Sequence, residues 1–245
     1  MTLFIVFVIL AYLLGSICSA IIVCRVFSLP DPRQEGSKNP GATNVLRIAG
    51  KHFAALVMAG DVLKGLIPVL LAKFCGAGAI TVGFTALAAV IGHMYPIFFE
   101  FKGGKGVATA LGGLFGIQIF AGTIVAAIWL LVAKFTRYSS LASIISMIFA
   151  PIIAIMVTSS VDIFPPLGIM TLLILFKHRN NITRLLDGTE PKITFSSHNP
   201  HGILDDVMAA PPPDPHEVKK EVIEESVEEI KAEQTHHPKP EKKEE

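Results

Sequence analysis

The amino-acid sequence predicts an all-α polytopic membrane protein with seven transmembrane helices, the N-terminus outside and the C-terminus in the cytoplasm. Of its 245 residues, 51% are hydrophobic and 17% are charged, and the mean hydropathy is +0.57, which is high for a soluble domain. The apolar residues form six runs nearly free of charge: 3–26, 53–75, 77–98, 107–131, 141–159 and 163–176. Roughly 20 apolar helical residues cross the core of a bilayer. Several runs reach this length, which excludes a soluble protein.

The first run is expected to be a retained helix, not a signal peptide. Its start lacks a basic residue, its apolar stretch is long, and it ends at Arg25 instead of a small-residue cleavage site. In the third run, Pro96 is expected to end the helix. Run 107–131 is expected to contain two segments broken near 116–118, the first of them short enough to be re-entrant.

Lysine and arginine set the predicted orientation. They cluster in the connections after the first and third runs, after residue 131 and after residue 176, whereas the intervening connections carry few. By the positive-inside rule, the basic connections face the cytoplasm. This alternation requires seven helices.

Charge also separates two predicted domains, an integral membrane domain at 1–195 and an acidic cytoplasmic tail at 196–245. The first has 15 Lys and Arg against 7 Asp and Glu, and the second has 6 against 13. A proline-rich linker at 210–215 precedes a Glu/Lys-rich stretch, for which disorder is favoured over a short helix. The three cysteines lack metal-ligand spacing. We expect neither a metal nor a cofactor.

The first of three polar stretches is G-S-K-N-P-G-A-T-N-V-L-R, at 36–47. Pro40 forbids a continuous helix, and the glycines permit a tight loop with exposed N–H groups. Thr43 or Asn44 could cap the next helix, and Arg47 supplies a forked cation. This mixture suits phosphate, although a capped loop facing anionic lipid explains it equally well.

The second stretch, F-K-G-G-K-G-V-A-T at 101–109, opens an apolar helix. Free N–H groups and the positive dipole end make a helix N-terminus an anion site, here with Gly103, Gly104, Lys105 and Gly106. A Walker A loop is a poor match, because Gly106 stands where Ser or Thr should follow the lysine. The stretch predicts phosphate binding without a nucleotide.

The third stretch, K-H-R-N-N-I-T-R at 177–184, is expected at the cytoplasmic end of the last helix. His178 and Asn181 are three residues apart and should share one helical face. A histidine can exchange a proton near neutral pH, although anchoring at the membrane interface would also explain it.

Five other polar positions carry weaker predictions. Asp61 and Lys64, inside the second run, should pair structurally and face the protein interior, with support of a site as the alternative. Ser140 and Ser143 lie at a helix start, where they could cap the helix or bind phosphate. His93 is expected to be an interfacial packing residue.

The three polar stretches together resemble the signature regions of the bacterial acyl-phosphate-dependent glycerol-3-phosphate acyltransferases, the PlsY family. The likeness runs from about residue 12 to 193 and includes L-P-D-P-R at 29–33 and D-V-L-K-G at 61–65. Lys38 departs from it, since glycine is expected there in many members. The resemblance implies a seven-helix enzyme of the Gram-negative inner membrane with its active site facing the cytoplasm. It implies transfer of a fatty acyl group from acyl phosphate to the sn-1 hydroxyl of glycerol 3-phosphate, giving lysophosphatidic acid and phosphate in the first acylation of phospholipid synthesis.

The cationic polar stretches fit this reaction, because both substrates are anionic. An acyl phosphate is already activated, so the reaction requires no covalent enzyme intermediate. Predicted catalytic residues are Ser37, Arg47, Lys105, His178 and Asn181, and predicted substrate- or phosphate-binding residues are Asn39, Thr43, Asn44, Gly103, Gly104, Gly106, Ser140 and Ser143. The hydroxyl proton would pass to the donor phosphate or to His178. Besides the two substrates, expected partners are membrane lipid and an acyl-phosphate-producing enzyme, but not nucleic acid.

Two other functions are alternatives. A small-anion or phosphate transporter would gather polar residues near the bilayer midplane, whereas here only Asp61 and Lys64 lie deep in a run. A non-catalytic scaffold predicts that Arg47→Ala and Lys105→Ala are harmless.

Overall fold

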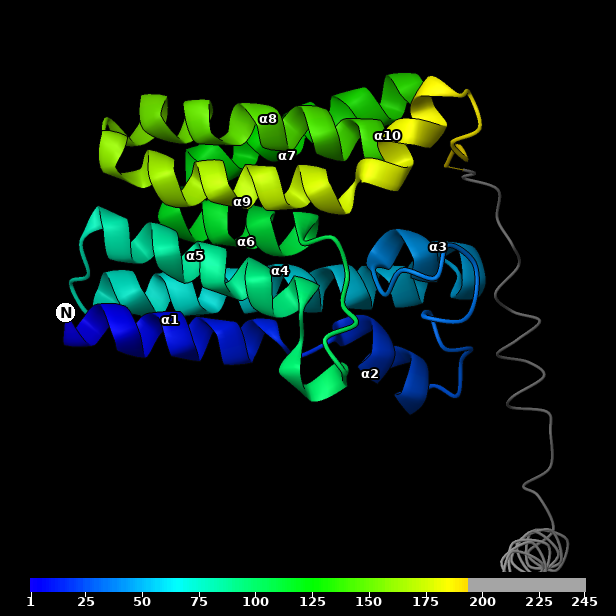
Figure 1. Ribbon diagram of the computed structural model, residues 1–245, viewed down its shortest axis with the longest axis horizontal. Coiled ribbons are helices and arrows are strands. Elements are labelled where there is room, and N and C mark those ends of the chain that lie inside the picture. Colours follow the sequence, from blue (N-terminus) through cyan, green and yellow to red (C-terminus); the bar gives the residue numbers. More distant parts are fainter. Residues whose placement is uncertain (194–245) are drawn as a thin grey trace, which may run out of the picture. The chain divides into compact units, whose positions relative to one another are not determined.

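The computed structural model describes residues 1–193, and every regular element within them is a helix (Figure 1). The elements are α1 (Thr2–Gly15), α2 (Ser19–Val26), α3 (Ala42–Ala49), α4 (Lys51–Phe74), α5 (Ala79–Met94), η1 (Ile97–Phe99), α6 (Val107–Ile117), α7 (Ile119–Thr136), α8 (Ser139–Thr158), η2 (Val161–Ile163), α9 (Phe164–Lys177) and α10 (Arg179–Leu186). The predicted tail at 196–245 lies outside the described residues.

Long helices packed side by side form the body of the membrane domain (Figure 1). Helix α4 packs against α1, α5 and α6, whereas α8 packs against α7 and α9. Val90, Leu114, Met147 and Met170 are fully buried between them. Contact between α4 and α6 is close, because a Cβ on Gly112 would overlap the backbone carbonyl of Val62.

Several of these helices are long enough to cross a membrane. Within residues 1–193 there are five candidate spans, in which α1 and α2 count as one (Thr2–Val26) and α5 and η1 as one (Ala79–Phe99). There are six if α9 and α10, bent by 57°, are also counted together. Helix α6 has only 11 residues, about 17 Å of rise, too little to span the hydrocarbon core alone. The all-helical class and apolar spans are confirmed, and seven crossings with the proposed orientation stay predictions.

The first apolar run forms one candidate span, Thr2–Val26, but this span contains a break that was not predicted. Helix α1 ends at Gly15 and α2 begins at Ser19. The Ser16 hydroxyl donates to the Tyr12 carbonyl at 2.8 Å, and Lys64 Nζ donates to the Ile17 carbonyl at 2.8 Å. The break is therefore stabilised by side chains that satisfy carbonyls near it.

The predicted break in run 107–131 is confirmed at Gln118, between α6 and α7. The Gln118 side chain accepts the Phe120 N–H at 3.1 Å and so caps α7. Lys73 Nζ donates to the carbonyls of Gly116 and Ile117 at 3.1 and 2.8 Å. Pro96 also acts as predicted, since α5 ends just before it.

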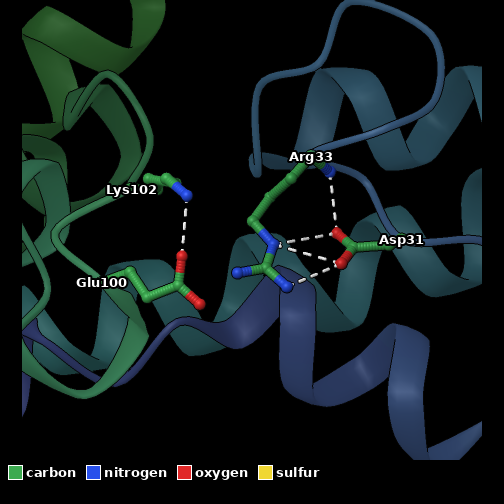
Figure 2. A network of polar contacts seen from close by, with 4 residues as sticks. All are labelled: Asp31, Arg33, Glu100 and Lys102. Carbon is green, nitrogen blue, oxygen red and sulfur yellow. Dashed lines mark hydrogen bonds and ion pairs between the residues drawn. The ribbon is translucent and has the colours of Figure 1, made fainter. Parts of the chain in front are cut away.

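The polar stretches gather at the end of the bundle opposite the N-terminus, where α3, α10 and the η1–α6 connection lie (Figure 1). Figure 2 shows two ion pairs on the neighbouring connections, Arg33–Asp31 and Lys102–Glu100, both 2.7 Å long. The Arg33 guanidinium lies between Asp31 and Glu100 in this view. These pairs contribute little free energy because they are partly or fully exposed.

Candidate active site

One cavity of about 770 Å³ brings the three polar stretches together. It is lined by the predicted catalytic residues Ser37, Arg47, Lys105, His178 and Asn181, and by the predicted binding residues Asn39, Thr43, Asn44, Gly106, Ser140 and Ser143. Gly103 and Gly104 are not among the lining residues. Segments far apart in the sequence thus surround a single space.

The loop before α3 is shaped by Asn44. The predicted cap is wrong: Gly41 is the N-cap of α3, and neither Thr43 nor Asn44 caps the helix. Instead the buried Asn44 amide accepts the Ser37 N–H at 2.7 Å and donates to the carbonyls of Pro32 and Glu35 at 2.9 and 3.0 Å. This amide is committed to the loop, so its geometry does not support the predicted phosphate contact.

The glycines before α6 have two different roles. Gly106, with φ +87°, is the N-cap of α6 and lines the cavity. The Gly104 N–H already donates to the His93 carbonyl at 3.1 Å, so the prediction that it is free for phosphate is wrong. A Cβ on Gly103 or Gly104 would overlap atoms of His93. These two glycines therefore permit close packing of the loop on α5.

A chain of hydrogen bonds orients Lys105. Its Nζ donates to Oδ1 of Asn181, whose Nδ2 donates to Glu190 at 2.7 Å. Arg184 Nε donates to the other Glu190 oxygen at 2.8 Å. Lysine can only donate and a carboxylate only accepts, so the two contacts fix the orientation of the Asn181 amide. Arg184 ends the third polar stretch, whereas no sequence motif marked Glu190, which joins the site because the chain turns after α10.

The surroundings of Lys105 lower the pKa of its ammonium group. Burial lowers the pKa of Lys105 to about 8; Glu190 opposes the decrease, and the cations Arg184 and Arg47 add to it. Burial by itself would raise the pKa of Glu190, but polar contacts from Ser140, Asn181 and Arg184 outweigh it and hold the pKa below its usual value. Within residues 1–193, Lys105 contacts a neutral amide and forms no ion pair, so its charge is available to an anionic ligand.

His178 lies where the chain bends by 57° between α9 and α10. His178 is the N-cap of α10 and Asn181 lies in its first turn, so the prediction that the two share one helical face is confirmed: both are buried and line the cavity. His178 Nδ1 is 2.8 Å from the Ile174 carbonyl. A carbonyl only accepts, so Nδ1 carries the hydrogen and Nε2 of the neutral ring has the lone pair.

The predicted pair of Asp61 and Lys64 is confirmed, with 2.8 Å between Oδ1 and Nζ and both side chains buried. His93 is buried and packs against Gly104, in line with the expected packing role, but it also lines the cavity together with Asp61, and its Nδ1 is 3.5 Å from Asp61 Oδ1. Ser143 donates to the Ser139 carbonyl at 2.8 Å and accepts from Trp129 Nε1 at 3.0 Å. The Ser143 hydroxyl thus supports the wall of the cavity.

Part of the cavity lining is apolar. It is formed by Met58 of α4, Val107, Ala108 and Leu111 of α6, and Ala126 and Leu130 of α7. Met58 and Leu130 are also exposed on the surface of the bundle. An apolar wall that reaches a lipid-facing surface suits a hydrocarbon chain, whereas the cationic wall suits a phosphate.

Fold and cavity together define an integral membrane protein suited to an amphiphile with an anionic head group. A family model described as glycerol-3-phosphate acyltransferase matches residues 5–188. This chain belongs to that family of acyltransferases, the PlsY family.

Sequence relatives and solved structures agree with this assignment. A glycerol-3-phosphate acyltransferase of Legionella pneumophila is 55% identical over 94% of this chain and 82% of its own length, and one of Vibrio vulnificus is 52% identical over 76% and 90%. Crystal structures of PlsY, an integral membrane glycerol 3-phosphate acyltransferase, are similar as well. Its glycerol 3-phosphate form has a TM-score of 0.74 at 43% identity, covering 78% of this chain and 96% of that one. Its lysophosphatidic acid form has a TM-score of 0.72 at 42% identity, covering 78% and 95%.

Proposed function

We propose that this protein transfers a fatty acyl group from an acyl phosphate to the sn-1 hydroxyl of glycerol 3-phosphate, releasing lysophosphatidic acid and phosphate. One observation carries the proposal: Arg47, Lys105 and His178, from three separate stretches, line one cavity that also has an apolar wall. Two phosphate-bearing substrates require adjacent cationic sites, and an acyl chain requires the apolar wall. The forms of PlsY with glycerol 3-phosphate and lysophosphatidic acid support the same acceptor and product.

The acceptor and the donor phosphate have different partners in this proposal. Arg47 and Ser37, on the loop and helix that border one side of the cavity, hold phosphate oxygens. Lys105, at the start of α6, faces the leaving phosphate and stabilises the charge that develops on it. Asn181 orients Lys105 and is within reach of the acceptor, because it lines the same cavity.

The reaction needs no covalent enzyme intermediate. The acceptor oxygen attacks the acyl carbonyl carbon, a new ester bond forms, and the bond between this carbon and the phosphate oxygen breaks. The hydroxyl proton leaves with the phosphate or passes to Nε2 of His178, the ring nitrogen with the lone pair. If His178 takes the proton, His178→Asn nearly abolishes kcat and barely changes binding, whereas a loss confined to KM assigns His178 to binding.

The donor is tested with purified protein in detergent or vesicles. Palmitoyl phosphate with labelled glycerol 3-phosphate should yield labelled lysophosphatidic acid, and palmitoyl coenzyme A in its place should not. Arg47→Ala and Lys105→Ala should remove this activity. Product from the thioester alone would refute the proposed donor, and unchanged activity in both variants would refute the proposed site.

We also propose that the site faces the cytoplasm of the bacterial inner membrane, with seven crossings. The basic polar end of the bundle supports this orientation. Cys75 provides a natural probe, because it is exposed after α4, whereas Cys18 and Cys24 are buried. A membrane-impermeant maleimide should label Cys75 in intact spheroplasts, and labelling only after lysis would reverse the orientation.

A small-anion transporter is less well supported than an acyltransferase. Its midplane site would have to use Asp61 and Lys64, and these two charges already pair with one another. Uptake of labelled phosphate into proteoliposomes, without acyl transfer, would favour the transporter.

A further inference from the structure

A second imidazole, His93, lines the cavity but has no part in the proposed reaction. It lies near the end of α5 and is buried, with its Nδ1 3.5 Å from Oδ1 of Asp61 on α4. Within residues 1–193, neither atom has a well-aligned hydrogen bond. A carboxylate buried in a membrane protein is costly, so its position beside an imidazole calls for a functional explanation.

Pairing with Lys64 accounts for the charge of Asp61 but not for its position. Lys64 Nζ lies 2.8 Å from Asp61 Oδ1 and also donates to the Ile17 carbonyl, at the break between α1 and α2. Asp61 is thereby held from one side, and the carboxylate oxygen that contacts Lys64 is the one nearest to His93.

His93 in turn contacts the loop that carries Lys105 at two points. Its carbonyl accepts the Gly104 N–H at 3.1 Å. Its ring lies against Gly104, because a Cβ at this glycine would overlap Nε2 of His93. The Pro40 carbonyl, from the loop before α3, borders the same glycine. Rotation of the His93 ring would therefore displace the residue that directly precedes Lys105.

We propose that Asp61 and His93 are a positioning pair for Lys105. Asp61 fixes the ring of His93, and His93 fixes the loop at Gly104, so that Lys105 reaches Asn181 and an anion in the cavity. Both residues act through Lys105 and not on the substrate. The kinetic readouts of this inference rest on the proposed function, whereas its binding readout does not.

The first test compares variants of nearly unchanged size. Asp61→Asn should lower kcat by at least about 10-fold while the KM for glycerol 3-phosphate changes by less than about 2-fold. Thr85→Val is the matched control, since Thr85 is buried in α5 and its hydroxyl donates only to the Thr81 carbonyl. Thr85→Val should retain wild-type kcat. A wild-type kcat in Asp61→Asn, or equal losses in both variants, would overturn the proposal.

The second test probes His93 directly and remains available if Asp61→Asn fails to fold. An asparagine amide nitrogen can stand where Nδ1 of histidine stands, so His93→Asn can still donate to Asp61. The kcat of His93→Asn should be about 10-fold higher than the kcat of His93→Ala. Equal kcat values in these two variants would contradict a role for the contact with Asp61.

Binding provides a test that does not depend on acyl transfer. Inorganic phosphate should raise the Tm of the wild-type protein, and the increase should be smaller in Asp61→Asn and in Lys105→Ala. The double variant should bind phosphate no more weakly than Lys105→Ala, because Asp61 acts through the lysine. Additive weakening would overturn the proposal. If the wild-type protein binds phosphate but transfers no acyl group, the proposed function fails while the positioning pair is still tested.

Discussion

Raising the pH through 8 should remove most of the activity, because the reaction as proposed needs Lys105 in its charged form. Burial lowers the pKa of Lys105 to about 8 from an ordinary value of 10.5. The lysine is then about 90% charged at pH 7 and about 10% charged at pH 9. We therefore expect kcat/KM for the acyl phosphate to fall about 9-fold between pH 7 and pH 9.

The corresponding decrease in kcat should occur at higher pH. A bound phosphate dianion stabilises the ammonium form, so the pKa of Lys105 is higher in the complex than in the free enzyme. Phosphate monoesters have a second pKa of about 6, so titration of glycerol 3-phosphate does not contribute above pH 7.5.

The assay is a pH series of initial rates with palmitoyl phosphate and labelled glycerol 3-phosphate, corrected for spontaneous hydrolysis of the donor. Lys105→Arg is the control, because a guanidinium stays charged throughout the series. Any activity that this variant retains should be flat between pH 7 and pH 9.

Unfolding would not account for the expected decrease. The unfolded chain holds the Lys105 proton up to a pKa near 10.5 and the folded protein only to about 8, so this group makes folding more favourable as the pH rises between these values. A wild-type profile that is flat from pH 7 to pH 9, or an equal decrease in Lys105→Arg, would refute the role given to Lys105.

Four further predictions follow from individual contacts. Asn181→Leu removes the hydrogen-bond partner of Lys105 Nζ and of one Glu190 oxygen, so kcat/KM should fall by about 100-fold in the acyl-transfer assay; a loss below 3-fold would contradict this. Arg47→Lys keeps the charge but not the forked donors, and should raise a substrate KM by about 10-fold, with little change in kcat. Gly112→Ala forces α4 and α6 apart and should lower the free energy of unfolding by about 1–3 kcal/mol, seen as a lower Tm. Gly168→Ala is the control and should not lower the Tm, because a Cβ there meets only Phe164 at 4.0 Å. Lys38 has a left-handed φ of +57°, so Lys38→Gly should raise the Tm by removing about 1 kcal/mol of strain.

Much of the site could be predicted, because most of its residues lie in short stretches of sequence with distinctive chemistry. Glycines beside Lys105, and glycine and proline in the loop before Arg47, favour backbone bends that can bind an anion, and such local patterns do not depend on the rest of the fold. The pairing of Asp61 with Lys64 was predictable for the same reason, since one helical turn separates them. The roles of His93 and Glu190 were missed. His93 faces Asp61 on another helix, and Glu190 meets Asn181 and Arg184 only because the chain turns back after α10.

The sequence by itself determined the all-helical membrane class, the break at Gln118 and the three polar stretches, since apolar run length, proline and glycine act locally on the backbone. Only the tertiary structure decided which N–H groups are free, because the carbonyl of His93 that occupies the Gly104 N–H belongs to a different helix. It also decided the state of Lys105, whose pKa depends on burial and on the distances to Glu190, Arg184 and Arg47. Burial and long-range electrostatics depend on how the helices pack in space, which no short stretch of sequence specifies.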